Sequence, residues 1–424
     1  MNSLKSIGLT FGIVALGCTV FAQSSSKLDS LAKEVSLLKK QTSALANLKI
    51  SGFIQAQYQY ADTLGARNFN GGNFSNQTDN RFSVRRARLK FAYDMSFGSA
   101  TLQFDATEKG VIIKNAYLTI GAPFSKQLSL TGGIFDRPFG YAVEYSSSAM
   151  EVVERPIIIQ TLFPGEQDLG AMVAFKADES SLLNGLAAKA GLFNGNGINS
   201  DVDKFKDLIA KVSYSGLSQN SFYLNVGVSA YYGNVYNPTT TLFEMSEVNT
   251  VKAFAAQTKE VGARLKRQYL GFDIQGSLKT SAGKTTLTSE YIAGKQPGSI
   301  SSSKSPDYAV LPTASAYIRR FSGGYITLIH QYNKVAFFGR YDWYDPNTKV
   351  KGNEVGQSTG GVTPTNAADL MLTSTSIGSF YEPNKSLRIT AQYDFNRFEK
   401  SDNGRFSVAG YKNNLLTLRI QYKF

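Results

Sequence analysis

The chain has 424 residues, of which 42% are hydrophobic and 18% are charged, and its formal net charge is +13. This apolar content excludes a wholly disordered chain. One cysteine and one histidine are too few for a disulfide framework, a structural zinc site or a Cys/His catalytic pair. We therefore expect no metal, no cofactor and no enzymatic activity, and without a basic run or recognition motif we expect no nucleic-acid partner.

The N-terminus has the pattern of a signal peptide over residues 1–22. Lys5 precedes an apolar stretch over 7–20, and Ala22 ends a cleavage site of the small-x-small kind. Processing at Cys18, as in a lipoprotein, is the alternative, but Ala15 stands where such signals usually carry Leu. No later run reaches the 18 apolar residues of a membrane helix. The sequence therefore predicts an exported chain without helical membrane spans.

Residues 23–47 carry a short heptad pattern. Apolar or small residues are spaced by three and four positions, with Lys and Glu between them, at Leu28, Leu31, Val35, Leu38, Thr42 and Leu45. Three heptads are near the lower limit for a coiled coil. The pattern predicts either a small coiled coil that gathers identical chains, as in a trimer, or an amphipathic tether.

From residue 48 onward the hydrophobic period changes from 3.5 to two. Apolar residues alternate with polar ones over 416–424, over 386–396 and over 220–233. Such alternation predicts strands with one apolar and one polar face. Segments of about ten residues have the length that a tilted strand needs to cross a bilayer.

The spacing of these strands predicts a closed barrel. We expect sixteen strands, with an error of about two, at 48–60, 81–93, 99–107, 111–120, 127–136, 168–177, 185–194, 205–216, 220–233, 262–279, 284–294, 321–331, 334–344, 368–381, 386–397 and 414–424. The connections between them alternate long and short, except that 108–110 is short and 195–204 is of medium length where long loops are expected. This pattern is typical of an all-β, antiparallel transmembrane barrel over 48–424, which leaves no unpaired backbone in lipid.

The polar faces of the strands should line a water-filled lumen. The basic residues on these faces are Arg86, Arg88, Lys90, Lys176, Lys189, Lys211, Arg340, Arg388, Arg419 and Lys423, and the acidic residues are Asp105, Asp273, Glu290, Asp342 and Asp394. This balance predicts a net positive channel that draws anions. Alternatively, some of these charges lie at the rims or pair across strands.

The long connection 137–167 is the expected constriction loop. It carries the apolar run 157–159, which would be buried if the loop folded inward against the wall. Its charges include Glu151, Glu154 and Arg155. Acidic side chains here, facing Arg86, Arg88 and Arg340, predict a transverse field across the pore, unless Glu151 and Glu154 lie at the rim.

Five separated segments resemble the phosphate-selective porin O/P family. They are Phe82–Lys90, Gly133–Gly140, Glu290–Gly298, Arg340–Asp345 and the terminal strand Leu416–Phe424. The resemblance implies a 16-stranded porin in the outer membrane of a Gram-negative bacterium, a homotrimer in contact with outer-membrane lipid. The terminal Phe424 resembles the insertion signal of outer-membrane barrels.

The expected function is passive diffusion of small hydrophilic or anionic solutes through a water-filled channel. Family members that select phosphate pair an arginine ladder with a lysine-rich constriction, whereas this constriction loop is acidic. We therefore expect a weak anion preference rather than strict selection of phosphate. The alternative is a secreted or surface-exposed β-protein that acts as an adhesin or carbohydrate-binding module.

Overall fold

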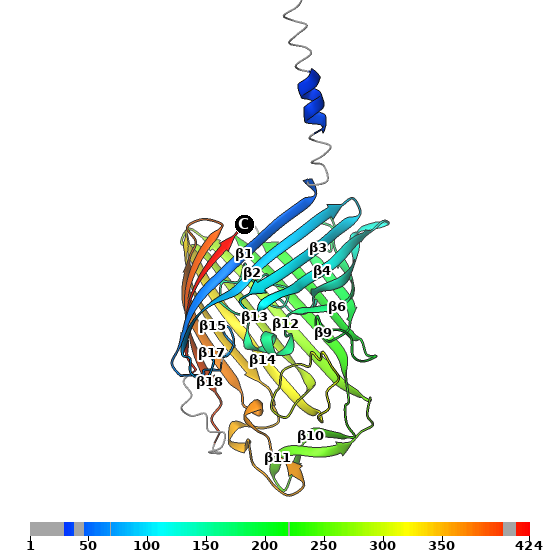
Figure 1. Cartoon of the computed structure of the whole chain (residues 1–424), viewed down its shortest axis with the longest axis vertical. Coiled ribbons are helices and arrows are strands. Elements are labelled where there is room, and N and C mark those ends of the chain that lie inside the picture. Colours follow the sequence, from blue (N-terminus) through cyan, green and yellow to red (C-terminus); the bar gives the residue numbers. More distant parts are fainter. Residues whose placement is uncertain (1–28, 38–45, 68, 219–220, 402–412) are drawn as a thin grey trace, which may run out of the picture.

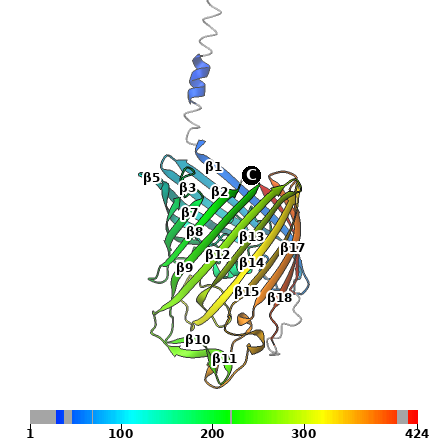
Figure 2. The same cartoon turned by 180° about the vertical axis from the view of Figure 1, so that it is seen from behind.

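The computed structural model describes residues 29–37, 46–67, 69–218, 221–401 and 413–424. Within these residues, sixteen long antiparallel strands form a barrel (Figures 1 and 2). They are β1 (Leu48–Ala61), β2 (Asn80–Met95), β3 (Gly98–Thr107), β4 (Gly110–Ala122), β5 (Ser125–Asp136), β6 (Gln167–Lys176), β7 (Leu186–Phe193), β8 (Asp207–Ser218), β9 (Phe222–Tyr236), β12 (Arg264–Thr280), β13 (Gly283–Gly298), β14 (Tyr317–Tyr332), β15 (Val335–Asp345), β17 (Leu372–Tyr381), β18 (Leu387–Phe398) and β19 (Leu415–Lys423). The predicted fold class and strand number are confirmed.

The barrel closes because the first strand pairs with the last. β1 and β19 are antiparallel over nine residue pairs. The backbones of Gly52 and Phe424 extend this ladder by exchanging hydrogen bonds of 2.9 and 3.0 Å. Closure leaves no open sheet edge, which is the condition for a sheet to cross lipid.

The alternation read from the sequence separates an apolar outer face from a polar inner face. On β19, Leu418, Ile420 and Tyr422 are exposed, whereas Arg419 and Gln421 between them are buried inside the barrel. Exposed apolar side chains recur on the outer face of the other strands, such as Ile54, Val228, Leu270, Phe337 and Ile389. This outer surface matches the hydrocarbon of a membrane.

The connections differ at the two ends of the barrel. Tight turns join β2 to β3, β12 to β13, and β14 to β15, and longer connections lie at the other end. The exception is the turn at residues 108–109, which joins β3 to β4 and leaves the wall low where a long loop was expected.

Additional short elements project beyond the barrel at the end with the long connections. β10 (Thr241–Val248) and β11 (Val251–Thr258) form a hairpin, and β16 (Val362–Thr363) pairs with β11. The 3-10 helices η1 (Gly352–Glu354) and η2 (Ala367–Asp369) lie in the same region (Figure 1).

The N-terminal segment is described in part. Residues 29–37 are helical and stand away from the barrel (Figure 1). Leu31 and Val35 of the heptad pattern are 64% and 44% exposed. The predicted signal peptide 1–22 and the heptad residues Leu28, Leu38, Thr42 and Leu45 lie outside the described residues. Across the described parts of the chain, no helix combines the length and hydropathy that a membrane span requires.

Residues 137–166 fold into the barrel, where they form its largest apolar cluster with the wall. The short helix α2 (Ile157–Leu162) lies within this segment and buries Ile157, Ile158 and Ile159. The segment contributes Phe139, Val143, Leu162 and Phe163, and the wall contributes Phe135, Phe193, Ile209, Tyr231, Tyr269, Ile292, Phe321, Tyr325 and Tyr344. The inner wall therefore carries an apolar patch where it packs against α2 and the start of this segment.

Candidate functional site

Two cavities follow one another along β1 to β4, between the wall and the loop 137–166. One measures about 460 Å³ and reaches the low wall at residues 107–112, and the other measures about 360 Å³ and reaches Lys423. Arg88 and Lys114 line both cavities. The loop therefore leaves two neighbouring cavities along this side of the barrel, which we call the passage, and these two cations are shared by both.

Two β-bulges add basic side chains to this passage. The partners of β1 jump from Arg86 to Val84, so Arg85 is an extra residue in β2. A second irregularity in the β3–β4 register leaves Lys114 as an extra residue in β4. A bulge lets two consecutive residues face the same side. Strict alternation assigns both residues to the lipid face, so neither is among the pore-lining residues predicted from the sequence.

Glu154 on the loop is surrounded by three arginines. Its carboxylate accepts two hydrogen bonds from Arg85 at 2.7 and 2.8 Å, one from Arg86 at 2.8 Å and one from Arg419 at 2.8 Å. Glu154 is only 1% exposed. Burial alone would raise its pKa, but the charges of Arg85, Arg86 and Arg419 outweigh burial and hold the pKa well below its usual range.

Further arginines of the wall bind backbone carbonyls of the same loop. Arg340 donates to the carbonyl of Glu154 at 2.6 Å, and Arg388 donates to that of Met150 at 2.6 Å. Arg419 donates to the carbonyl of Val153 at 2.5 Å. These predicted pore-lining residues thus hold the loop against the wall. The acidic loop does not face Arg86 and Arg340 across open water, as expected from the sequence, but is in direct contact with them.

Arg155 connects two parts of the loop 137–166 and lines the smaller of the two cavities. Its guanidinium pairs with Glu166 at 2.9 Å and donates to the carbonyl of Tyr145 at 2.8 Å. Glu166 also pairs with Lys114. Burial would raise the pKa of Glu166, but Lys114 and Arg155 outweigh it and lower that pKa. The carboxylate of Glu166 therefore stays charged and offsets part of the positive charge of Lys114, which lines both cavities.

The remaining predicted side chains divide between the passage and the opposite wall. Arg88 pairs with Asp105 at 2.7 Å. Lys90 lines the smaller cavity and forms no ion pair within the described residues. On the other side of the loop, Lys189 and Lys211 both pair with Glu144. The structure thus brings Arg86, Arg88 and Lys90 together at the passage, but not Lys189 and Lys211.

The start of the loop depends on a glycine in close contact with a wall carboxylate. Gly140 has φ +58°, and a Cβ at this position would overlap the carboxylate of Glu290. Glu290 accepts a hydrogen bond from the backbone N–H of Ala142 at 3.1 Å, and Ser229 accepts one from that of Gly140 at 2.9 Å. Only glycine tolerates both this conformation and this approach.

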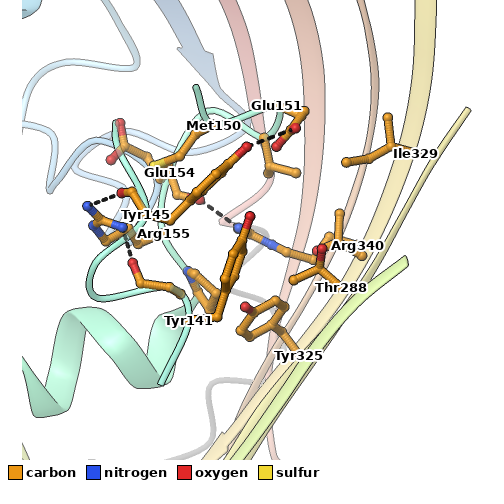
Figure 3. Close-up of a pocket in the computed structure, with 14 residues that line it drawn as sticks. Tyr141, Tyr145, Met150, Glu151, Glu154, Arg155, Thr288, Tyr325, Ile329 and Arg340 are labelled. Carbon is orange, nitrogen blue, oxygen red and sulfur yellow. Dashed lines mark hydrogen bonds between the residues drawn. The ribbon is translucent and has the colours of Figure 1, made fainter. Parts of the chain in front are cut away.

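Glu151 differs from the other acids of the loop. Its carboxylate accepts a hydrogen bond from the hydroxyl of Tyr145 at 3.0 Å (Figure 3), but it forms no ion pair in the part of the chain that the structure describes. Burial raises its pKa, against a weaker lowering by a backbone hydrogen bond, by the hydrogen bond from Tyr145 and by the charges of Arg388 and Lys284.

Comparison with solved structures shows the same barrel fold. The chain is similar to the outer membrane channel DcaP of Acinetobacter baumannii, with 16% identity, a TM-score of 0.51, and coverage of 89% of this chain and 97% of that chain. It is also similar to OmpF of Salmonella typhi in complex with daunomycin, with 12% identity, a TM-score of 0.52 and the same coverage of both chains. A loop-deletion mutant of OmpT from Vibrio cholerae gives 10% identity and a TM-score of 0.50, covering 89% of this chain and 99% of that chain.

Sequence comparison extends the assignment from fold to family. No curated protein sequence gives a significant match. The family model of phosphate-selective porin O and P matches residues 56–424, which include nearly the whole barrel. The chain therefore belongs to the phosphate-selective porin O and P family and is a non-enzymatic channel of the Gram-negative outer membrane.

Proposed function

We propose that this porin passes small hydrophilic solutes by passive diffusion with a modest preference for anions, inorganic phosphate among them. The charge of the passage carries the proposal. In the described residues, its two cavities are lined by nine basic side chains, namely Arg85, Arg86, Arg88, Lys90, Lys109, Lys114, Arg155, Lys304 and Lys423. The acidic side chains that line them are Asp105, Asp136, Glu144 and Glu166.

An excess of fixed positive charge raises the local concentration of anions in a narrow aqueous channel. Conduction also requires that each site be weak enough to release the ion. The ion pairs of Arg88 with Asp105 and of Lys114 with Glu166 reduce the charge available to a passing anion. This compensation favours a modest preference rather than tight binding of phosphate.

The closed wall and the polar passage favour a channel over the alternative of an adhesin or a carbohydrate-binding module. We also propose that the channel assembles as a homotrimer. The exposed Leu31 and Val35 lie on the apolar stripe of the heptad pattern and would be covered in a coiled coil of identical chains.

The experiment is the reversal potential of the reconstituted channel in a tenfold gradient of potassium chloride. We expect the sign of the reversal potential to show that the channel selects anions over cations. We also expect larger fluctuations of the current when potassium phosphate replaces potassium chloride. Lys90→Glu should move the reversal potential toward cations, because Lys90 has no ion pair whose loss would disturb the wall. Lys126→Glu makes the same charge change at an exposed position outside the cavities and should have little effect. Equal shifts in the two variants, or a cation-selective wild type, would overturn the proposal.

A further inference from the structure

A side pocket adjoins the larger cavity of the passage. It measures about 270 Å³ and lies between β4, the end of the loop 137–166 and the connections 194–206 and 299–316. Lys114 and Lys304 line both the side pocket and the larger cavity. We propose that the side pocket binds the hydroxyl groups of sugar phosphates and polyol phosphates while their phosphate lies in the larger cavity. This inference rests on the proposed anion preference and names the class of solute.

The larger cavity supplies the charge that a phosphate group requires. Within the described residues, six basic and two acidic side chains line it. Lys109 forms no ion pair in this part of the chain, and Lys304 lies 3.6 Å from Asp307 in a partly exposed pair. A phosphate monoester carries between about 1.5 and 2 negative charges near pH 7. The cavity therefore attracts it more strongly than a singly charged carboxylate.

The side pocket offers uncharged donors and acceptors instead. Two of its lining amides, Asn196 and Gln167, are only 6% and 3% exposed. In the part of the chain that the structure describes, Nδ2 of Asn196 and Oε1 of Gln167 have no hydrogen-bond partner. A buried polar group without a partner is destabilising, so a ligand that pairs with it is favoured. A hydroxyl can accept from Asn196 and can donate to Gln167, whereas a hydrocarbon group can do neither.

The two amides are held in place by the surrounding wall. The side-chain N–H of Gln167 donates to the carboxylate of Asp136, which fixes its Oε1 as the free acceptor. The carbonyl of Gly195 accepts a hydrogen bond from Arg267 at 2.8 Å, which anchors the turn next to Asn196. Groups that are already ordered lose little freedom when a ligand binds. With the larger cavity of about 460 Å³, the side pocket reaches the size range of small-molecule sites, about 300–1,000 Å³.

The experiment compares glucose 6-phosphate with cyclohexyl phosphate in single-channel recordings of the porin in planar bilayers with potassium chloride. The two probes share a six-membered ring and a phosphate, but the cyclohexyl ring carries no hydroxyl. We expect both to reduce the current in a saturable way, and glucose 6-phosphate to do so at a concentration at least fivefold lower, because a site that pairs with hydroxyls disfavours an analogue without them. Equal or greater potency of cyclohexyl phosphate would overturn the inference, and stronger inhibition by glucose than by glucose 6-phosphate would refute the ligand class.

A matched pair of variants locates the site. Asn196→Ala removes the unpartnered amide and should weaken glucose 6-phosphate at least threefold without changing cyclohexyl phosphate, which also shows that the passage is intact. Asn353→Ala makes the same change at an exposed position in η1 and should alter neither probe. Unchanged potency of glucose 6-phosphate in Asn196→Ala would refute the side pocket as the site. Failure of both phosphates to inhibit the wild type would count against the anion preference itself, whereas equal inhibition by both would count against the side pocket alone.

Discussion

Neutralising Glu154 tests whether its three arginines hold the loop in the barrel. In Glu154→Gln the carboxylate that accepts four hydrogen bonds from Arg85, Arg86 and Arg419 is replaced by a neutral amide. Removing one partner of a buried ion pair typically costs about 3–5 kcal/mol. We expect this change to destabilise the inward-folded position of the loop rather than the barrel itself, because the strands keep all the backbone hydrogen bonds that join them.

A cost of this size would increase the population of a released loop by roughly a hundredfold to several thousandfold. Single-channel recordings should therefore show a larger mean conductance with frequent brief fluctuations. Loss of one negative charge should also move the reversal potential toward anions. Glu151→Gln makes the same charge change on the same loop, where no ion pair is lost within the described residues, and its current should stay steady. If both variants give equally steady currents, the arginines do not hold the loop.

The same ion pairs predict a pH dependence of the wild type. Because the pKa of Glu154 is lowered in the folded loop, its stabilising effect is fully present above the ordinary glutamate pKa of about 4.3. It is lost as the pH falls through the lower pKa of the folded state. We expect steady currents at pH 5 and fluctuations like those of Glu154→Gln only in more acidic solution. Fluctuations that begin at pH 5 to 6 would contradict this explanation.

Three further changes test other parts of the molecule. Gly140→Ala should displace the start of the loop, since a Cβ would overlap Glu290 and a positive φ costs about 1 kcal/mol or more; a wild-type conductance would contradict this. Replacing Phe424 by Asp should lower the yield of heat-modifiable barrel, because its ring covers Gly52 at the seam of the barrel; a normal yield would count against the role of the seam. Deleting residues 27–46 should weaken crosslinked trimers while single-channel conductance persists; unchanged trimers would leave the segment as a tether only.

The sequence by itself determined the barrel. An alternation of apolar and polar residues with a period of two over about ten residues indicates which face of each strand contacts lipid. The alternation of short and long connections indicates that neighbouring strands are antiparallel. Both signals are local, so they are readable without knowing which strands are neighbours. The segments that resemble the porin family, such as Phe82–Lys90, lie on these strands and indicate the same fold.

Only the tertiary structure decided what the charged side chains do. Arg340, Arg388 and Arg419 lie on the predicted polar faces, but they bind the loop, which is distant from them in sequence. Arg85 and Lys114 reach the passage through bulges, which shift a strand's register by one residue without a clear mark in the alternation. The course of the passage depends on where the loop packs, and that is set by long-range contacts between its apolar residues and the wall.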